Sequence, residues 1–454
     1  MNILLATYNF YPYHWGGSEV YVFGLAKYLQ NKGHHVTILA AMPEKGFSGC
    51  PVVYEDNNIK IGQYEHEGLT VLGAHLPVTT AEVYSRYNPA WEASWLQFFE
   101  QYTEGGNNFD LLHLHAFTPL IGSALVDALK KTSPGIKTLM SYHVVENCPK
   151  GNMSYFGKTI CNIKPDTHTC AACMLQERTG ASETISKIIE NLLPAINMGN
   201  LPSLFQLKYL AKISIEGMAA FFGHIDRWIF FSEQTQWAVL NFAVAENKTK
   251  VIRHGVSDHF FNIDRPAINK DGKQVFVYVG RFKKLKGFHV LLKAWLAMEE
   301  KEGRKLLLIG GSDNLESEIK NLLEKINKRN DVEVVGRVAA AEVVQYLKNA
   351  DCIIIPSINL ETGPLVFHEA IAAGVNVIAS NVGGCKELAD IYKNGCTTFE
   401  PGNARSLSEK INKFNFQKTT SQPMGQKAHY DLVLNEINDL VHRSKQINTD
   451  SLIC

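Results

Sequence analysis

The sequence predicts an α/β fold of two doubly wound parallel-sheet domains that face each other across a cleft. Short runs rich in Leu and β-branched residues alternate with helical patterns in both halves of the chain, which indicates parallel strands joined by helices. A polar stretch with Pro and Gly over residues 258–273 divides the halves and is typical of a linker. The length of 454 residues, against roughly 150 residues per domain, allows two large domains. Because parallel sheets bind ligands beyond the carboxyl ends of their strands, we expect the functional site in the cleft.

The N-terminal domain is expected over residues 1–257. Its predicted strands are 2–8, 35–40, 69–76, 111–116, 138–143 and 228–232. The first helix has the clearest pattern, because Ser18 can cap its start and Gly33 can end it. Its apolar residues fall on one face, namely Val22, Leu25, Ala26 and Leu29.

Residues 191–223 do not fit this alternation. A stretch without charges, Asn191 to Leu207, runs into a helical pattern that ends near residue 223. We interpret the segment as a helical excursion that covers the first sheet. The alternative is a surface segment that contacts lipid or a lipid-linked acceptor, for which Lys208 and Lys212 supply only two basic charges.

The C-terminal domain is expected over residues 274–424. Its predicted strands are 274–280, 305–311, 332–337, 352–357 and 376–381. Residues 425–454 follow this domain and contain a predicted helix. The helical spacing is that of Tyr430, Leu434, Ile437 and Val441.

Composition excludes several classes of protein. The 45 basic and 45 acidic side chains cancel, so the chain lacks the broad positive field of a nucleic-acid-binding protein. The apolar share of 45% and the charged share of 20% are those of a globular protein with a core. The first residues lack the basic lead of a signal peptide, and no apolar run reaches the ~18 residues that span a bilayer. We therefore expect a cytoplasmic protein, either free or peripheral on the inner face of the membrane.

Two turns carry residues suited to binding phosphate. Gly16 and Gly17 precede the first helix, where the backbone can approach an anion at the positive end of the helix dipole, although a tight turn needs glycine about as often. The turn GRFKKLKG follows strand 274–280 and brings Arg281 and Lys286 to the start of the next helix. A guanidinium and an ammonium placed there can bind pyrophosphate, and the alternative is a solvated basic turn.

Two glutamates follow the strand that ends at residue 357, in the string NLETGPLVFHEAIAAGVNVIASNVGGCKE. Glu361 lies in the loop at the carboxyl end of the strand, and Glu369 lies in the next helix. Carboxylates at this edge of a parallel sheet can accept hydrogen bonds from sugar hydroxyls. Glu369 has the alternative of an ordinary exposed helix position, but its neighbours in sequence are apolar, so its carboxylate needs a partner.

Taken in order, these segments resemble the family 4 retaining glycosyltransferases of the GT-B fold. The resemblance is carried by YPYHWGGSEVYVFGLAKYLQNKGHHVTIL, FFSEQTQ, KVIRHGV, GRFKKLKG and the Glu-x7-Glu pair, and it covers residues 1 to about 403. It implies two Rossmann-like domains and transfer of a sugar from a nucleoside-diphosphate sugar to a saccharide or lipid-linked acceptor. Cell-surface polysaccharide or glycolipid synthesis is the implied setting, with a C-terminal helix that returns to the first domain.

The resemblance implies a role for each candidate in the second domain. Arg281 and Lys286 would hold the diphosphate of the donor, Glu369 its ribose, and Glu361 a hydroxyl of the transferred sugar. A further pair of donor-binding residues would be Gly383 and Gly384.

The resemblance also implies roles for residues of the first domain. Gly16 and Gly17 would close on the donor from the opposite side. His143 ends strand 138–143 and would lie near the donor sugar, whereas considered alone it would be an ordinary strand-end histidine.

Two features bear on the implied chemistry. Gly363 and Pro364 stand where the common form of the family motif has Phe-Gly, so the donor identity stays open. The sequence contains no Asp-x-Asp, which resembles the metal-independent GT-B pattern, so we expect no cofactor for catalysis. The alternatives are a GT-B sugar-nucleotide epimerase, a glycogen-synthase-like polymerase and a non-catalytic protein that binds nucleotide sugars.

A cysteine-rich insertion is expected at residues 146–176. Four of the nine cysteines lie there, and the last two form a Cys-x2-Cys pair: Cys148, Cys161, Cys170 and Cys173. Four thiolates would close a structural zinc site, and four reduced thiols without metal are the alternative. His168 could replace one sulfur ligand, and ligand type alone also allows an iron–sulfur cluster. The remaining candidates, Cys352, Cys385 and Cys396, are expected to be small core residues.

Overall fold

The computed structural model describes residues 1–14, 16–104, 106–143, 147–157, 159–199, 202–241, 244–261, 263, 272–300 and 303–450. The chain folds into two compact units. The first comprises Met1–Phe230, Gln236–Val251 and the C-terminal segment from Tyr430, and the second comprises Phe231–Thr235 and Ile252–His429. Most of the predicted linker, residues 262 and 264–271, and Glu146 and Lys158 of the predicted insertion lie outside the described residues.

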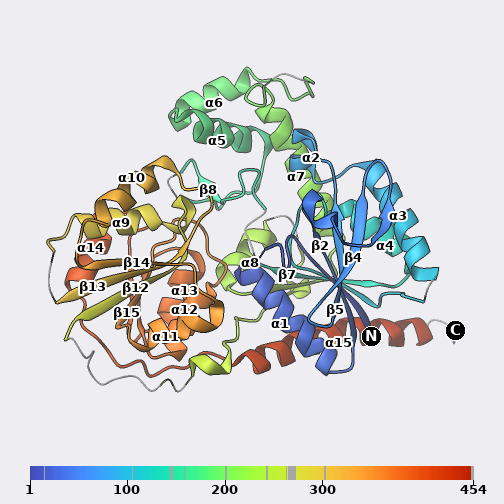
Figure 1. The fold of residues 1–454 in the computed structure, drawn as a ribbon. Coiled ribbons are helices and arrows are strands. Elements are labelled where there is room, and N and C mark those ends of the chain that lie inside the picture. The colour runs from blue at the N-terminus through green and yellow to red at the C-terminus, as the bar shows by residue number, and fades with distance from the viewer. Residues whose placement is uncertain are drawn as a thin grey trace. The chain divides into compact units, whose positions relative to one another are not determined.

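A nine-stranded sheet forms the centre of the first unit, in the order β11-β10-β7-β6-β1-β2-β5-β4-β3 (Figure 1). Its strands are β1 (Asn2–Thr7), β2 (His35–Ala41), β3 (Val52–Glu55), β4 (Lys60–His66), β5 (Leu69–His75), β6 (Leu111–Leu114), β7 (Lys137–Tyr142), β10 (Arg227–Phe230) and β11 (Thr249–Val251). All six predicted strands are present and pair with one another in parallel, and β4 pairs in antiparallel fashion with both β5 and β3. The sequence did not predict β3, β4 and β11, because β3 and β11 are short edge strands and β4 is partly polar.

Helices pack on this sheet and bury its apolar faces. They are α1 (Gly17–Asn31), α2 (Thr80–Ser85), α3 (Pro89–Glu104), α4 (Ser123–Thr132), α7 (Leu207–Gly223) and α8 (Glu233–Leu240), with two 3-10 helices, η1 (Glu44–Phe47) and η2 (Glu246–Lys248). One core cluster joins Trp95 of α3, Leu125 of α4 and Phe221 of α7 to strand residues such as Leu112. The predicted helical excursion over the first sheet is therefore confirmed for α7, which begins at Leu207.

The start of α1 differs from the prediction. Gly16 is the N-cap and makes no side-chain cap bond, while the Ser18 hydroxyl lies inside the first turn and donates to Glu19 Oε2 at 3.1 Å. Ser18 as the cap is therefore wrong, because the preceding glycine turn starts the helix earlier. The predicted apolar face is buried, and the helix ends before Gly33, whose φ of 83° is left-handed.

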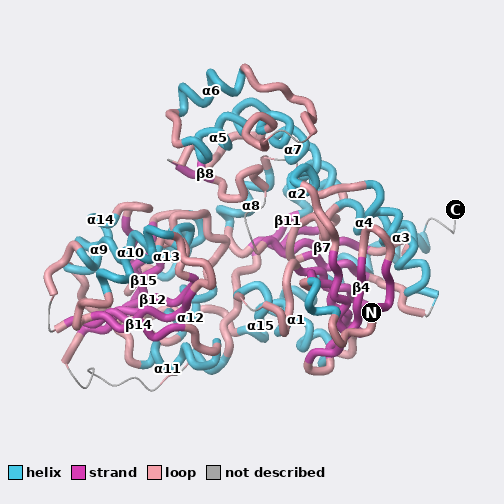
Figure 2. Tube along the Cα trace, turned by 45° about the horizontal axis from the view of Figure 1, so that its top comes forward, coloured by secondary structure: helices cyan, strands magenta, loops and turns pink. Residues whose placement is uncertain are grey.

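A small accessory segment separates β7 from α7. It contains β8 (Ser154–Tyr155), β9 (Thr159–Ile160), α5 (Thr167–Thr179) and α6 (Glu183–Asn191). Figures 1 and 2 show α5 and α6 side by side. The two short strands form an antiparallel pair of their own and do not join the large sheet.

The second unit is built on a six-stranded parallel sheet in the order β14-β13-β12-β15-β16-β17. The strands are β12 (Gln274–Arg281), β13 (Arg304–Gly311), β14 (Val332–Gly336), β15 (Cys352–Ile355), β16 (Asn376–Ser380) and β17 (Cys396–Phe399). Neighbouring residues face opposite cores, so that Phe276 and Ile354 belong to one cluster and Val277 and Ile353 to the other. Burial on both faces explains why these strands read as continuous apolar runs. The sequence missed β17, which is only partly buried.

Helices cover both faces of this second sheet. They are α9 (Phe288–Leu296), α10 (Ser317–Ile326), α11 (Val343–Lys348), α12 (Leu365–Ala372), α13 (Gly383–Tyr392) and α14 (Ala404–Asn412), with η3 (Asp258–Phe260), η4 (Lys284–Lys286) and η5 (Ala340–Glu342). Figure 1 shows α9, α10 and α14 on one face and α11, α12 and α13 on the other. Cys352 and Cys385 are fully buried core residues as predicted, and Cys396 is partly exposed.

The C-terminal helix is α15 (Gln426–Asp450), which from Tyr430 onward belongs to the first unit. Its buried stripe consists of Tyr430, Val433, Ile437 and Val441. Leu434, predicted to be part of that stripe, is only half-buried, because Val433 takes the inward position. Arg227 Nη1 donates to Glu436 Oε2 at 2.7 Å and adds an ion pair between β10 and this helix. In the described part of the chain, no helix combines the length and apolar character needed to cross a bilayer.

Candidate functional site

The turn that carries Lys286 is pressed against the loop that follows β15. Gly287 ends η4 with a left-handed φ of 66°, and a Cβ atom there would lie 1.6 Å from the carbonyl oxygen of Pro356. Only glycine allows this approach. The Ile358 N–H also donates to the Leu285 carbonyl at 3.2 Å. The basic turn and the loop with Glu361 are therefore held together by backbone contacts.

Lys286 and Glu361 form an ion pair at this junction. The ammonium nitrogen lies 2.7 Å from Glu361 Oε1, and the Ser357 hydroxyl donates to the same oxygen. The lysine side chain is 37% exposed and the glutamate side chain 12% exposed. An ammonium has three hydrogens to donate, so this bond leaves Lys286 able to bind an anion from the open side.

Arg281 is the last residue of β12 and lies at the same edge of the sheet. Its side chain is exposed and has no hydrogen-bond or ion-pair partner within the residues that the structure describes. The Tyr278 hydroxyl donates to the backbone carbonyl of Arg281 at 2.7 Å. The pKa of Tyr278 is raised by burial and by Glu361 and lowered by Arg281, so both charges lie near this hydroxyl. The unpaired guanidinium can therefore accept an anionic ligand.

Glu369 lies on α12 and is a carboxylate in an apolar setting. Burial raises the pKa of its carboxyl group from the usual 4.5 to about 7. Among the described residues, its carboxyl group has no hydrogen-bond or ion-pair partner, and nothing links it to Lys286 or Glu361. The residue as a whole is half-buried, and a carboxyl group withdrawn from water without a partner is costly, so the site favours a ligand that donates hydrogen bonds to it.

Gly383 and Gly384 open α13 and pack against the Glu361 loop. The Gly384 N–H donates to the Glu361 carbonyl at 2.7 Å, and a Cβ at Gly384 would lie 2.7 Å from the Gly363 nitrogen. Gly383 has a left-handed φ of 51°, and the N-cap, Val382, offers no side-chain cap. The first N–H groups of α13 therefore lie beside the Glu361 loop without a side-chain acceptor from the N-cap.

The sequence did not predict the ion pair between Arg253 and Glu387 in this unit. Arg253, from the KVIRHGV segment, donates through Nη2 to Glu387 Oε1 at 2.7 Å. The other oxygen of Glu387 accepts the N–H groups of Glu233 at 2.8 Å and Gln234 at 3.3 Å, which caps the start of α8. These partners are 134 to 154 positions apart in sequence, so no local pattern could pair them.

In the first unit, His143 is part of a histidine cluster at the carboxyl ends of β6 and β7. His115 Nδ1 lies 3.0 Å from His143 Nε2, and His113 Nε2 lies 2.9 Å from the Ser141 hydroxyl. Burial lowers the pKa of His113 to about 3 and that of His115 well below its usual value, so both rings are neutral at pH 7. His113 and His115 were missed, although their alternation in LLHLHA marks a strand with both side chains on one face.

Gly16 and Gly17 lie at the start of α1 in the first unit, as predicted from the sequence. Gly16 has extended backbone, with φ of −159°, and a Cβ there would lie 2.8 Å from Glu19 Oε2. Glu19 is buried and lies 3.4 Å from His14 Nδ1 through its other oxygen. A carboxylate therefore already lies within the first turn of this helix.

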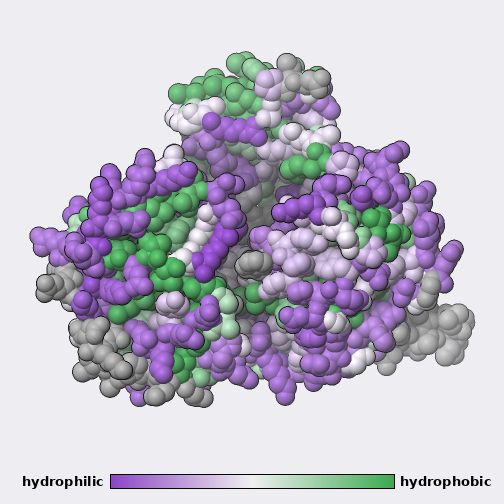
Figure 3. Space-filling model, in the orientation of Figure 1, coloured by the Kyte–Doolittle hydropathy of each residue, from purple (hydrophilic) through white to green (hydrophobic). Residues whose placement is uncertain are grey.

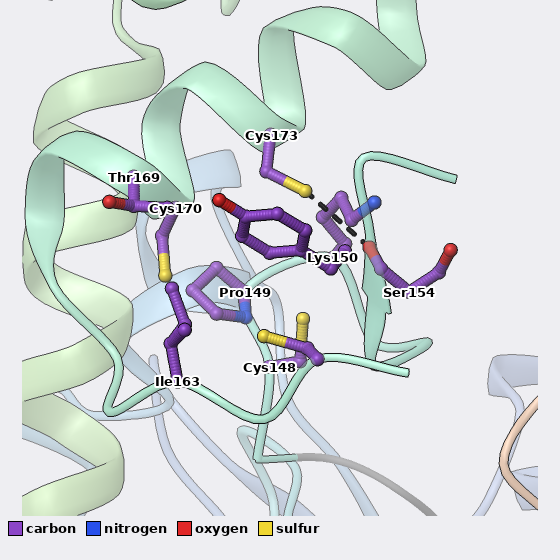
Figure 4. A pocket seen from close by; sticks show the side chains of 10 residues that line it. Cys148, Pro149, Lys150, Ser154, Ile163, Thr169, Cys170 and Cys173 are labelled. Atoms are coloured by element: carbon purple, nitrogen blue, oxygen red, sulfur yellow. Dashed lines mark hydrogen bonds between the residues drawn. The ribbon is translucent and has the colours of Figure 1, made fainter. Parts of the chain in front are cut away.

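The four cysteines of the insertion line one pocket, together with Lys150, Tyr155 and other residues of the accessory segment (Figure 4). None forms a disulfide. Burial raises the pKa of Cys170 to about 12 and also raises that of Cys161 and Cys173. Across the described ranges, no three histidine, cysteine or acidic side chains are already arranged to hold a metal ion.

Two protein-family models match the chain. The model described as Glycosyltransferase Family 4 matches residues 15–160, and the model described as Glycosyl transferases group 1 matches residues 260–429. The chain belongs to family 4 of the glycosyltransferases. The predicted resemblance is therefore confirmed. The first match covers Gly16, Gly17 and His143, and the second covers every candidate residue of the second unit, whereas Cys161, Cys170 and Cys173 lie outside both.

Curated relatives of this family 4 protein match over part of their length. An uncharacterized glycosyltransferase of Methanocaldococcus jannaschii is 30% identical over 182 residues, which is 38% of this chain and 46% of that protein. An amylovoran biosynthesis glycosyltransferase of Erwinia amylovora is 28% identical over 167 residues, which is 36% of this chain and 40% of that protein. The matches thus span less than half the length of either relative.

Solved structures match over nearly the whole chain. A glycosyltransferase from Rickettsia africae has a TM-score of 0.56 and 18% identity, and the match covers 99% of this chain and 98% of that one. Anabaena HepE in complex with UDP and glucose has a TM-score of 0.54 and 14% identity, covering 100% and 99%. This likeness is one of fold, and it confirms the predicted GT-B class.

Proposed function

We propose that this family 4 protein transfers a sugar from a nucleoside-diphosphate sugar to a saccharide or lipid-linked acceptor, with retention of configuration at the anomeric carbon. The observation that carries the proposal is the cluster at one sheet edge of the second unit. There Lys286 contacts Glu361, and Arg281 lies at the same edge without a side-chain partner among the described residues. Glu369 lies apart from this cluster on α12, and its carboxyl group also lacks a partner among those residues. The fold neighbour HepE, solved with UDP and glucose and with UDP-glucose, supports a nucleotide-sugar donor.

In this proposal the charged residues bind different parts of the donor. Arg281 and Lys286 bind the diphosphate, the first with a planar fork and the second as a point charge. Glu369 accepts hydrogen bonds from the ribose, which gives its carboxylate the partner that it lacks. Glu361 orients a hydroxyl of the sugar and holds the Lys286 ammonium in place. Gly383 and Gly384 complete the donor site, the first through its N–H group and the second by holding the Glu361 carbonyl with its own N–H group.

Stabilising the leaving group is the main catalytic task in this scheme. The bond from the anomeric carbon to the diphosphate oxygen breaks as the acceptor oxygen approaches the same face, and the departing diphosphate takes the acceptor proton. Arg281 and Lys286 then offset the charge that develops on the diphosphate, without a metal ion. From the first unit, His143 interacts with the donor sugar, its ring held by His115, and Gly16 and Gly17 contribute backbone around the donor.

Acceptor binding is proposed to include peripheral contact with a membrane through α6. The polar face of this helix is buried and its apolar face is exposed. Ser186 and Glu190 are buried, while Ile188 is 61% exposed and Leu192, just beyond the helix, is 81% exposed. Lys208 lies 3.2 Å from Glu190 and is largely buried, so it is not free to bind lipid phosphate. Figure 3 shows the hydrophobic patch over α6 at the top of the view. The contact would therefore rest on apolar area rather than on charge.

Product analysis tests the proposed reaction. Nucleotide sugars are first screened for the one that raises the melting temperature, since a ligand that binds the native state stabilises it. That donor is then incubated with saccharide and lipid-linked acceptors, and the anomeric configuration of the product is read by NMR. Retention supports the proposal, and inversion overturns its mechanism. An epimerised nucleotide sugar, or binding without any product, would instead support the epimerase or the non-catalytic alternative.

A further inference from the structure

The cysteines of the accessory segment come from three separate pieces of chain. Cys148 lies in the turn closed by the Gly151 N–H to the Cys148 carbonyl at 2.8 Å, and Cys161 follows β9, where its N–H donates to the Met153 carbonyl at 2.7 Å. Cys170 and Cys173 lie three residues apart on α5, and so share one face of that helix. In Figure 4, α5 carries these two side chains into the pocket from one side and Cys148 approaches from the opposite side.

The backbone makes hydrogen bonds with one of these sulfur atoms, that of Cys173. The Phe156 N–H donates to Cys173 Sγ at 3.2 Å. The Cys173 thiol in turn donates to the Ser154 carbonyl at 3.5 Å (Figure 4). Amide N–H groups aimed at sulfur stabilise a thiolate, and such outer contacts orient the ligands of metal sites.

Positive charge also lies at the pocket. The Lys150 side chain lines the pocket beside Cys173. Four thiolates around a divalent ion would leave a net charge of about −2, which a neighbouring ammonium offsets. His168, the substitute ligand considered from the sequence, does not line the pocket, because its Nδ1 pairs with Glu190 at 3.1 Å.

The loops that carry Cys148 and Cys161 have little apolar core of their own, whereas α5 packs on α7 through Ala171, Met174 and Leu175. The two strands of this segment have two residues each, and the core cluster of buried residues at the pocket contains only Phe156, Ala172 and Cys173 within the described ranges. Small units of this kind are usually fastened by disulfides or by a structural metal. The four cysteines of this segment form no disulfide, although all four line the same pocket.

We propose that Cys148, Cys161, Cys170 and Cys173 bind one zinc ion in a closed tetrahedral site. Rotation of the thiol side chains into the shared pocket would bring the sulfurs to the ion, since they are not arranged around one point in the structure. Each thiol that binds releases its proton to solvent. Four protein ligands leave no position for water or substrate, so the ion fastens the Cys148 turn and the Cys161 loop to α5 and takes no part in the transfer.

Metal analysis of the purified full chain tests this site. We expect about one zinc per chain, lost in Cys170→Ser. Cys50→Ser is the matched control, because Cys50 is a half-buried free thiol outside the pocket, and it should keep the ion. Iron with labile sulfide in place of zinc would overturn the proposal in favour of a cluster. A metal-free protein whose four thiols remain titratable after incubation with zinc would overturn it as well.

A second measurement does not depend on a variant that folds. Cobalt(II) is exchanged into the wild-type chain, and we expect the intense visible and near-ultraviolet absorption of tetrahedral cobalt thiolate. Removal of the metal by a chelator should increase amide hydrogen exchange in residues 147–180 while exchange in the β12–β17 sheet stays unchanged. The absorption of six-coordinate cobalt, or exchange unaffected by the chelator, would contradict a structural tetrahedral site.

Discussion

In the second unit, Lys286 and Glu361 lie on turns that are fastened to a fully parallel sheet. In the first unit, Cys148 and Cys161 lie on loops beside two-residue strands, and only Cys170 and Cys173 lie on a helix, α5. The charged residues already touch, with 2.7 Å between the ammonium and the carboxylate. The thiols share a pocket but do not yet form a ligand set. A site on a rigid scaffold can therefore be assembled before its ligand binds, and a site on a small segment needs its ligand to complete the structure.

The largest expected effect is on the charged site. Lys286→Ala removes a preorganised cation from the proposed diphosphate position and should lower turnover about 100- to 1000-fold, with little change in the melting temperature. Lys284→Ala is the matched control in the same turn, since its ammonium pairs with Glu318 and not with Glu361. Initial rates of sugar transfer measure both variants. Equal rates for Lys286→Ala and the control would show that the turn is only a solvated basic segment.

The rigidity of the same site can be tested at its backbone. Gly287→Ala places a Cβ against the Pro356 carbonyl, 1.6 Å away, at a φ of 66°, and should lower the free energy of unfolding by about 2 to 4 kcal/mol. Gly303→Ala is the control, because that position has open space and no left-handed φ, and it should be neutral or slightly stabilising. Urea unfolding measures both. A neutral Gly287→Ala would mean that the two turns are not held together as described.

The sequence predicted the parts of this fold that repeat a simple pattern. Parallel strands buried on both faces form continuous apolar runs, and these led to β12, β13, β15 and β16. The edge strand β14 is half-buried to exposed and was found from its valines, whereas β17, with two threonines, was missed. The glutamate spacing and the basic turn likewise located Glu361 and Lys286 at one edge of that sheet. By contrast, the Arg253–Glu387 pair joins residues 134 positions apart and has no local signal.

Other features could not be predicted, because helical spacing shows which side chains share a face of a helix but not whether that face is buried or exposed. The sequence of α6 shows a clear apolar stripe at helical spacing, which in most helices faces inward. Here Glu190 is buried with Lys208 and the stripe faces outward. The sequence likewise suggested Ser18 as the N-cap. In the structure Gly16 is the N-cap, so Ser18 lies inside the first turn and its hydroxyl donates to Glu19.

A smaller effect is expected from the protonation of Glu369. Its pKa of about 7 means that the carboxylate able to accept ribose hydrogen bonds is a minor form at pH 6 and the main form at pH 8, so donor affinity should rise about tenfold across that range. In the free protein the sign is opposite: the free energy of unfolding falls as pH rises from about 4.5 to about 7, because the unfolded chain loses this proton first. Calorimetry with the nucleotide sugar measures the affinity. The slope should vanish in Glu369→Gln, and an unchanged slope there would assign it to another group.

The smallest effect on the folded protein is expected at α6 of the accessory segment. Ile188→Ala shortens a side chain that is 61% exposed, so the free energy of unfolding should change by less than about 0.5 kcal/mol. If this stripe contacts lipid, binding to neutral phosphatidylcholine vesicles should weaken by about 1 kcal/mol, or about fivefold, because apolar area is lost from the contact. Lys187→Ala on the same helix is the control and should bind as the wild type does, because the proposed contact does not depend on charge. Vesicle sedimentation measures all three chains. Loss of binding only in the lysine variant would make the contact electrostatic, and binding by none of them would remove the membrane from the proposal while leaving the charged site of the second unit untouched.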